Sequence, residues 1–292
     1  MPAIIERQTI NQARGFIDAL RPTGNPLERW LFRGVANADR YVLLPSAHRD
    51  EAAWQAFKPG FDPRHASEAA RKEAERELAR RFYLTLDKAG FPLPGMAPLT
   101  KAALHGVSSS WPPGAVTDLL ALAQHYDVPT RLLDWTDRGL VGAYFAALKP
   151  HGEEDSHLAV WALSRTFTRK YGLVSNGVQT TIHLVSAPRA SNPNLHAQGG
   201  QFTYCMDLET LRPLDDVIEE IYRRVREHTA DVDSLLPAMR CLRMPRSEAK
   251  HLLYLLHEEG VSGLSMFPDL SGVAKHIREA TWCERPTEEL DA

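Results

Sequence analysis

The chain has 292 residues, 43% of them hydrophobic, and a formal net charge of -3 at pH 7. This length and apolar content can supply a substantial buried core, so the sequence predicts a folded protein. The weak negative charge offers no general attraction to nucleic-acid phosphates or anionic lipids, which argues against a dedicated nucleic-acid binder.

The cysteines and the hydropathy pattern limit the choice further. Cys205, Cys241 and Cys283 lie far apart without C-x-x-C spacing, which fits neither a disulfide framework nor a zinc site. No segment approaches the ~20 uninterrupted apolar residues that span a bilayer. We therefore expect a cytoplasmic protein with no membrane partner and no metal site.

The first part of the chain is expected to alternate helices with extended segments. An amphipathic helix is predicted over residues 10–20, with Thr9 as its cap. Residues 30–32 and 41–44 are short apolar and aromatic runs separated by a polar turn, the pattern of a strand and a second extended piece. A long helix follows over residues 67–88, whose buried stripe runs at i+4 spacing from Ala70 to Leu86.

The proline-rich residues 91–114 are predicted to form mostly a loop, either a lid or a linker, with a short helix at residues 101–105. Later patterns predict helices over residues 116–127 and 140–148, strands at 157–163, 180–185 and 201–206, a helix over 215–228, a strand at 241–244 and a helix over 249–256 capped by Ser247 and stopped by Gly260. The sequence thus predicts a mixed α+β fold with a small central mixed or antiparallel sheet of about five or more strands flanked by helices.

Polar, site-forming residues concentrate in three stretches, of which the first is Phe32-Arg33-Gly34. Arg33 carries a permanent charge that suits a phosphate or carboxylate, and Gly34 permits close approach of a backbone. The alternative is that Arg33 pairs with a buried acid and holds the end of the strand.

The second stretch runs from Gln124 to Thr136 and packs seven kinds of polar or aromatic group into thirteen positions. Its candidate site residues are His125, Tyr126, Thr130, Arg131, Asp134, Trp135 and Thr136. The structural alternative makes Arg131 and Asp134 an ion pair, the two threonines helix caps, His125 a satisfied core histidine and Trp135 a core residue.

The third stretch, from Asn192 to Phe202, is a polar segment before an apolar strand. Amides such as Gln198 can bind hydroxyl groups of a ligand without adding charge. A tight turn with positive φ at Gly199 and Gly200 explains part of the stretch, but it explains Gln198 least.

Several common kinds of site are absent. The sequence has no G-x-S-x-G elbow, no G-x-x-x-x-G-K-[ST] phosphate loop and no H-E-x-x-H, which excludes the usual serine hydrolase, P-loop nucleotidase and zincin patterns. Glu73, Glu75 and Glu77 resemble an acid pair, but we assign them to the solvated face of the long helix.

Taken together, five segments resemble the FRG domain family, which is named after its Phe-Arg-Gly stretch. They are Leu31-Phe32-Arg33-Gly34, residues 41–45, residues 124–136 with Ala143-Tyr144-Phe145-Ala146, residues 192–202 and Phe267-Pro268-Asp269-Leu270. The resemblance implies an N-terminal helical segment at residues 1–28, the FRG domain at residues 29–281 and a flexible tail at residues 282–292. Members of the family occur mostly in bacteria, phages and mobile elements.

The order of an arginine, a hydroxyl-and-aromatic motif and an amide or acid on successive strands is also similar to that of ADP-ribosyltransferases. That likeness implies an NAD site with catalytic roles for Arg33, Asp134, Thr136 and Gln198. Arg33 would grip a phosphate or ribose, Trp135 and Tyr126 would flank the nicotinamide, Thr136 would support the site and Gln198 would contact the ribose or orient the acceptor. Gly34, His125, Thr130 and Arg131 complete the expected cofactor-binding set.

Transferases of this kind place a glutamate beside the reacting ribose, and the third stretch offers the amides Gln198 and Gln201 instead. Glu209 or Asp134 could supply the carboxylate. The expected function is an NAD-dependent ADP-ribosyltransferase-like protein, acting as a toxin or phage-defence effector on a macromolecular acceptor or on water, with an antitoxin-like partner. The rival expectations are a non-catalytic ligand- or partner-binding module and a structural hydrogen-bonded girdle.

Overall fold

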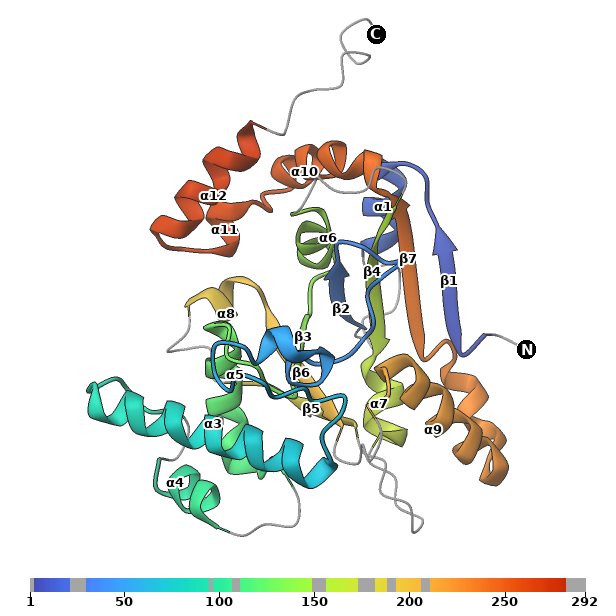
Figure 1. Cartoon of the computed structure of the whole chain (residues 1–292). Coiled ribbons are helices and arrows are strands. Elements are labelled where there is room, and N and C mark those ends of the chain that lie inside the picture. Colours follow the sequence, from blue (N-terminus) through green and yellow to red (C-terminus); the bar gives the residue numbers. More distant parts are fainter. Residues whose placement is uncertain are drawn as a thin grey trace, which may run out of the picture.

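The computed structural model describes residues 3–21, 30–94, 97–106, 111–148, 156–172, 182–187, 193–205 and 211–281. Its centre is an open sheet of seven described strands, flanked by helices, in the order β1-β7-β4-β2-β3-β6-β5 (Figure 1). The strands are β1 Ile5–Thr9, β2 Trp30–Val35, β3 Leu133–Thr136, β4 His157–Ser164, β5 Ile182–Val185, β6 Gly200–Cys205 and β7 Met239–Pro245. β1 pairs with β7 in parallel and the remaining pairs are antiparallel, which confirms the predicted mixed α+β class.

Helices flank this sheet, whereas its edge strand β1 is mostly exposed. They are α1 Ala13–Leu20, α2 Ser46–Arg49, α3 Glu68–Lys88, α4 Ala97–His105, α5 Thr117–His125, α6 Gly139–Ala147, α7 Arg165–Tyr171, α8 Pro193–Ala197, α9 Leu214–His228, α10 Ala249–Glu258, α11 Gly263–Met266 and α12 Leu270–Ala280. Short 3-10 helices lie at Glu51–Ala53, Gly114–Val116, Ala230–Leu235 and Arg246–Glu248. Within the described residues, none of the helices combines the length and the apolar character that a membrane crossing requires.

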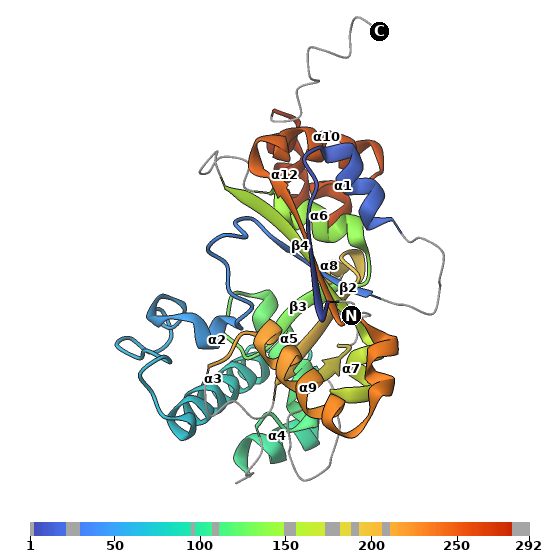
Figure 2. The same ribbon diagram turned by 90° about the vertical axis from the view of Figure 1, so that its right-hand side faces the viewer.

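Alternating residues of the strands build two cores on opposite faces of the sheet. Leu31, Val35 and Leu163 pack with α7 and α9, whereas Val160, Leu158 and Leu242 pack with α1, α6 and α10. A third cluster joins α3, α4 and α5 to β6. Figure 2 shows α1, α6 and α10 gathered at one end of the molecule, away from both α7 with α9 and α3 with α4. The central strands are therefore covered on both faces, as expected for runs that are nearly all apolar, such as β4.

The sequence patterns did not predict two of the described strands, β1 and β3, or five of the described helices, α2, α7, α8, α11 and α12. β1 has a single buried residue, Ile5, so its edge position left no alternating pattern to detect. β3 is only four residues long and lies within the polar second stretch, although Leu133 and Trp135 alternate with Asp134 and Thr136. The amphipathic α12 was missed although Leu270, Val273 and Ile277 recur at helical spacing, and in the structure all three are exposed.

Several local expectations need correction. Thr9 belongs to β1, and α1 begins after Gln12. The expected extended piece at residues 41–44 forms no strand, and the helix within the proline-rich stretch is longer than predicted, Ala97–His105. Ser247 does not cap the helix after it, because the N-cap of α10 is Glu248. Gly24, Pro26 and the expected tail at residues 282–292 lie outside the described residues.

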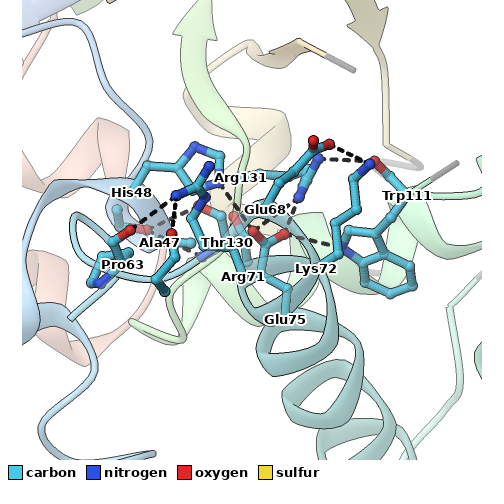
Figure 3. Close-up of polar contacts among 12 residues, drawn as sticks. Ala47, His48, Pro63, Glu68, Arg71, Lys72, Glu75, Trp111, Thr130 and Arg131 are labelled. Atoms are coloured by element: carbon cyan, nitrogen blue, oxygen red, sulfur yellow. Dashed lines mark hydrogen bonds and ion pairs between the residues drawn. The ribbon is translucent and has the colours of Figure 1, made fainter. Parts of the chain in front are cut away.

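The assignment of Glu75 to a solvated face was wrong. Its side chain is only 2% exposed and points from α3 to Arg131 and Trp111, as Figure 3 shows. Arg131 donates Nε to Oε2 of Glu75 at 2.6 Å and Nη2 to Oε1 at 3.0 Å, and Trp111 Nε1 donates to Oε2 at 3.0 Å. His48 Nε2 lies 3.0 Å from Oε1. The buried face of α3 includes Ala74 and Leu78 of the predicted stripe, but it also runs through Arg71 and Glu75, whereas Ala70 is exposed.

This charged cluster ties α2, α3 and the chain before β3 into one unit. Burial by itself would raise the pKa of Glu75, but the charges and hydrogen bonds of Arg131 and His48 lower it to about 2, from an ordinary value of 4.5. The carboxylate is therefore ionised in the folded protein at neutral pH. Removing one partner of such a pair leaves the other charge buried without compensation.

We predict that Glu75→Gln lowers the free energy of unfolding by about 3–5 kcal/mol, because it leaves Arg131 as an unpaired buried charge. Glu73→Gln is the matched control, since Glu73 lies on the same helix with a side chain 68% exposed, and it should change stability by less than about 1 kcal/mol. Urea unfolding at neutral pH measures the change in both variants.

The stabilisation by Glu75 should be fully present above about pH 4.5 and disappear as the pH falls toward about 2, because the pKa of Glu75 is lower in the folded than in the unfolded protein. Equal effects of the two variants would contradict the assignment.

Gly34 is needed for the packing of β2 against α6. A Cβ added to Gly34 would lie 2.0 Å from the carbonyl oxygen of Gly142 and 2.5 Å from the backbone nitrogen of Ala146. Backbone atoms of a helix cannot rotate away as a side chain can, so the helix itself would have to move. The glycine of the Phe-Arg-Gly stretch is thus a contact between two backbones.

We predict that Gly34→Ala destabilises the protein by about 3 kcal/mol or more, above the usual cost of overpacking, because α6 must separate from β2. Gly114→Ala is the control, since a Cβ there meets no atom within 4 Å. Thermal melting of the two variants measures the difference, and a Gly34→Ala protein that melts like the wild type would refute the close-contact explanation.

Candidate functional site

A pocket of about 760 Å³ opens where β2, β3 and β6 meet α5, α6 and α12. Its lining includes Phe32, Arg33, Gly34, Ser46, Arg49, Gln124, His125, Asp127, Asp134, Trp135, Thr136, Phe145, Asn194, Gln198, Phe267, Ser271 and Lys275. This size lies within the range of pockets that hold cofactors or drug-sized ligands. Three of the lining residues are lysine or arginine and two are aspartate.

The sheet order explains why distant segments meet here. β2, β3 and β6 are neighbours, and Phe32 stands opposite Thr136, which in turn stands opposite Gly200. The residues next to these positions are Arg33 and, just before β6, Gln198. The predicted Arg33, Thr136 and Gln198 therefore line the same hollow although the chain separates them widely.

Arg33 lies at the point where β2 and β3 pair. Phe32 and Thr136 form their one register contact, and beside it Arg33 Nη1 donates to the carbonyl oxygen of Asp134 at 2.7 Å. The same nitrogen lies 2.6 Å from Oδ1 of Asp134. Arg33 thus binds both the backbone and the side chain of one residue.

Tyr41 holds the guanidinium from the other side. Arg33 Nε and Nη2 donate to the Tyr41 hydroxyl at 3.1 and 2.5 Å, and Arg49 Nη2 donates to it at 2.8 Å. Burial lowers the pKa of Arg33, but Asp134 and Tyr41 more than offset this and raise it above its usual value. The arginine is therefore a fixed charge. It both pairs with an acid, as the structural alternative supposed, and lines the pocket.

Asp134 joins Arg33 to the second stretch. Burial raises the pKa of Asp134, but the charge and hydrogen bond of Arg33 bring it below the usual value. Gln124 Nε2 also donates to Oδ1 of Asp134 at 3.1 Å, and Thr130 Oγ1 donates to Gln124 Oε1 at 2.5 Å. The Asp134 side chain is 63% exposed, so the ionised carboxylate remains accessible from the pocket.

Three residues of the expected set lie outside the pocket lining. Thr130 is buried and orients Gln124, whereas Arg131 is buried with Glu75 and does not pair with Asp134 as the structural alternative supposed. Tyr126 is 64% exposed and is absent from the lining, so the expected pair of aromatic rings around a nicotinamide is not formed by Tyr126 and Trp135. The spacing of residues in the second stretch does not show which of its side chains face the pocket and which do not.

His125 and Asn194 form one polar edge of the pocket. His125 Nε2 lies 3.0 Å from Nδ2 of Asn194, which comes from α8. Burial lowers the pKa of His125, and the nearby Asp127 and Asp269 offset this only in part. The imidazole is therefore mainly neutral at pH 7.

The third stretch is built differently from the predicted loop. Much of it is the helix α8, and only Gly199 has a positive φ, of 61°, whereas Gly200 already belongs to β6. Thr136 Oγ1 donates to the carbonyl oxygen of Gln198 at 2.7 Å, and Gln198 Nε2 donates to the carbonyl oxygen of Met266 at 3.2 Å.

The third stretch supplies amides and no carboxylate to the described lining of the pocket. Gln201 lies outside the lining, where its Oε1 accepts hydrogen bonds from Ser186 Oγ at 2.6 Å and Arg165 Nη2 at 3.1 Å. Glu209 lies outside the described residues. Among the described lining residues the carboxylates are Asp127 and Asp134, and no glutamate is present.

The apolar wall comes from several elements. Phe145 of α6 and Phe267 form an edge contact with ring centres 6.3 Å apart, and Phe32 lines the same wall. Trp135 is almost fully buried, and its Nε1 donates to Thr203 Oγ1 at 2.9 Å. Its polar atom is thus used within the sheet, in agreement with the core role.

Seven polar residues of the described lining were not in the predicted set: Ser46, Arg49, Gln124, Asp127, Asn194, Ser271 and Lys275. Gln124 and Asn194 were inside the polar stretches, where their amides were a usable signal. Arg49 and Lys275 gave none, because single basic residues on short or amphipathic helices look like ordinary surface charges. In the structure Lys275 Nζ lies 4.0 Å from the centre of the Phe267 ring.

A comparison with protein families gives a match for the part of the chain that contains Arg33, Gly34 and the second stretch. Residues 28–155 match the family model of the FRG domain. This part of the chain is therefore similar to the FRG domain. Neither curated proteins nor solved structures gave a significant match. The FRG match contains β2, β3 and α2 to α6, whereas Gln198, Asn194 and Lys275 of the pocket lie beyond it, and the wider extent to residue 281 stays a prediction.

We predict that Asp134→Asn lowers the free energy of unfolding by about 1–3 kcal/mol, because the buried Arg33 loses its charged partner. Asp18→Asn is a close control: its side chain is also 63% exposed, but its partner Arg21 is 48% exposed, whereas Arg33 is 9% exposed. That exposed pair should contribute less than about 1 kcal/mol. Urea unfolding of both variants tests this, and equal losses would show that Arg33 does not depend on Asp134.

Proposed function

We propose that the pocket binds NAD and that the protein cleaves its nicotinamide bond, transferring ADP-ribose to a macromolecule or to water. The observation that carries the proposal is the meeting of Arg33, Asp134, Thr136 and Gln198 in one pocket of about 760 Å³. If these four side chains lay on separate faces of the protein, or were sealed in its core, they could not contact one ligand together.

The charges of the pocket suit an anionic ligand. Arg33 is held rigidly by Asp134 and Tyr41, and Arg49 and Lys275 add two further cationic groups to the lining. Arginine binds phosphate oxygens through a planar fork, and lysine acts as a point charge. A dinucleotide offers a pyrophosphate to these groups, ribose hydroxyls to the amides of Gln124 and Asn194, and planar rings to Phe32, Phe145 and Phe267.

Asp134 is the proposed carboxylate of the reaction. Loss of nicotinamide leaves positive charge on the ribose, which a nearby carboxylate stabilises. The lowered pKa of Asp134 keeps it ionised at neutral pH, and its exposure leaves it available to a ligand. A cell depleted of NAD, or with a modified essential macromolecule, would lose viability, which supports a role as a toxin or phage-defence effector whose partner is an acceptor or antitoxin-like protein.

A specific observation favours a second function, binding of a nucleotide without turnover. Asp134 already pairs with Arg33, and the Gln198 side-chain amide donates to Met266. Both groups that would act on the ribose are therefore held by the protein itself. In this alternative the same pocket serves as a sensor.

Two measurements on purified full-length protein separate these functions. Release of nicotinamide from NAD, with transfer of labelled ADP-ribose in a lysate, is expected for the wild type. Asp134→Asn should reduce the rate at least a hundredfold, while still binding NAD. NAD should raise the melting temperature by mass action whether or not turnover occurs.

Arg33→Ala should abolish both the thermal shift and the turnover, whereas Arg21→Ala, at an exposed arginine paired with Asp18 and Glu259, should change neither. A thermal shift without nicotinamide release would support the sensor. If the wild type shows neither a thermal shift nor nicotinamide release, the proposal that NAD is the ligand is wrong.

A further inference from the structure

A second cluster of chemically active side chains lies behind the wall that α12 contributes to the pocket. His257 of α10 and His276 and Glu279 of α12 place one possible ligand atom each within 4.8 Å of the others. His276 and Glu279 are three positions apart, so they lie on the same face of α12. The sequence patterns gave no sign of this group because His257 comes from another helix and H-E-x-x-H spacing is absent.

The distances within this cluster fit a small metal ion. His257 Nε2 lies 3.1 Å from Glu279 Oε2, close to the separation of about 3.3 Å between neighbouring ligands around tetrahedral zinc with bonds near 2 Å. The centres of the two imidazole rings are 5.2 Å apart. The rings are stacked within 8° of parallel, so one of them has to turn before both in-plane nitrogen lone pairs can point at one ion. Two imidazoles bound to one tetrahedral zinc ion have ring centres about 5 Å apart.

Neighbouring groups hold the carboxylate of Glu279 in place through hydrogen bonds, as the outer contacts of metal ligands do. Glu279 is almost fully buried, and its carboxylate also accepts hydrogen bonds from the Tyr144 hydroxyl at 2.5 Å and the Gly263 backbone nitrogen at 2.8 Å. Such outer contacts fix the orientation of a ligating carboxylate. His276 Nδ1 is buried without a hydrogen-bond partner in the described structure, so this ring has binding capacity that the protein does not use.

We propose that His257, His276 and Glu279 bind one divalent transition-metal ion, with zinc preferred. Two imidazoles and a carboxylate form a set that suits zinc better than magnesium or calcium, which favour oxygen ligands. Three protein ligands leave one position for water or another small ligand.

The ion would join α12 to α10. Because Lys275 and Ser271 of α12 line the pocket, the metal would hold that wall in place. The role assigned to the ion is structural, and it does not depend on whether the pocket binds NAD.

Titration of chelator-treated, full-length protein with zinc chloride tests the proposal by calorimetry and thermal melting. The wild type should bind one zinc ion per chain with micromolar or tighter affinity and should melt at a higher temperature when zinc is present. His276→Gln and His257→Gln should each weaken binding at least tenfold and lose the thermal shift.

His251→Gln is the matched control, since His251 is also a half-buried histidine of α10 but contacts Glu248 instead of the cluster. It should bind zinc like the wild type. If one histidine variant does not fold, the other and Tyr144→Phe, which should weaken binding by about tenfold through Glu279, provide the same comparison. Absence of zinc binding by the wild type, or equal binding by the wild type and the cluster variants, would overturn the proposal.

Discussion

The contact of Arg33 with Asp134 is the interaction on which the pocket depends. β2 and β3 pair through Phe32 and Thr136, and the guanidinium then contacts both the carbonyl group and the carboxylate of Asp134. The arginine therefore takes part in the connection between two strands and also faces the hollow beside them. Its charge cannot move away from the site without disturbing the sheet, which gives a ligand a preorganised cation at no further conformational cost.

Two of the buried arginines, Arg33 and Arg131, each pair with one acid, and the two pairs have different tasks. Arg131 with Glu75 is enclosed on all sides and connects α3 to the chain before β3. Arg33 is equally fixed, but its partner Asp134 is mostly exposed toward the pocket. The first pair is a structural connection, whereas the second combines a rigid cation with an accessible anion, an arrangement suited to chemistry on a charged ligand.

The pocket is assembled from parts of the chain that the FRG match includes and parts that it does not. Residues 28–155 supply Arg33, Asp134 and two phenylalanines of the apolar wall, Phe32 and Phe145. Asn194, Gln198 and Lys275 come from later elements, and Gln198 is itself attached to α11 through Met266. Differences in the later elements could therefore change ligand preference while the FRG segment keeps its charged centre.

The sequence by itself determined the fold class, most of the long helices, and the three polar stretches that meet in the pocket. These features depend on local periodicity and on the chemical type of individual residues, both of which are readable along the chain. It could not determine which acid each arginine would meet, because Glu75 and Asp134 differ in sequence distance from Arg131 but not in chemistry. Only the tertiary structure decided which acid each arginine pairs with, where the edge strand β1 lies, that Tyr126 stays out of the pocket lining, and that His257 meets His276. Each of these is set by contacts between segments that have no sequence pattern in common.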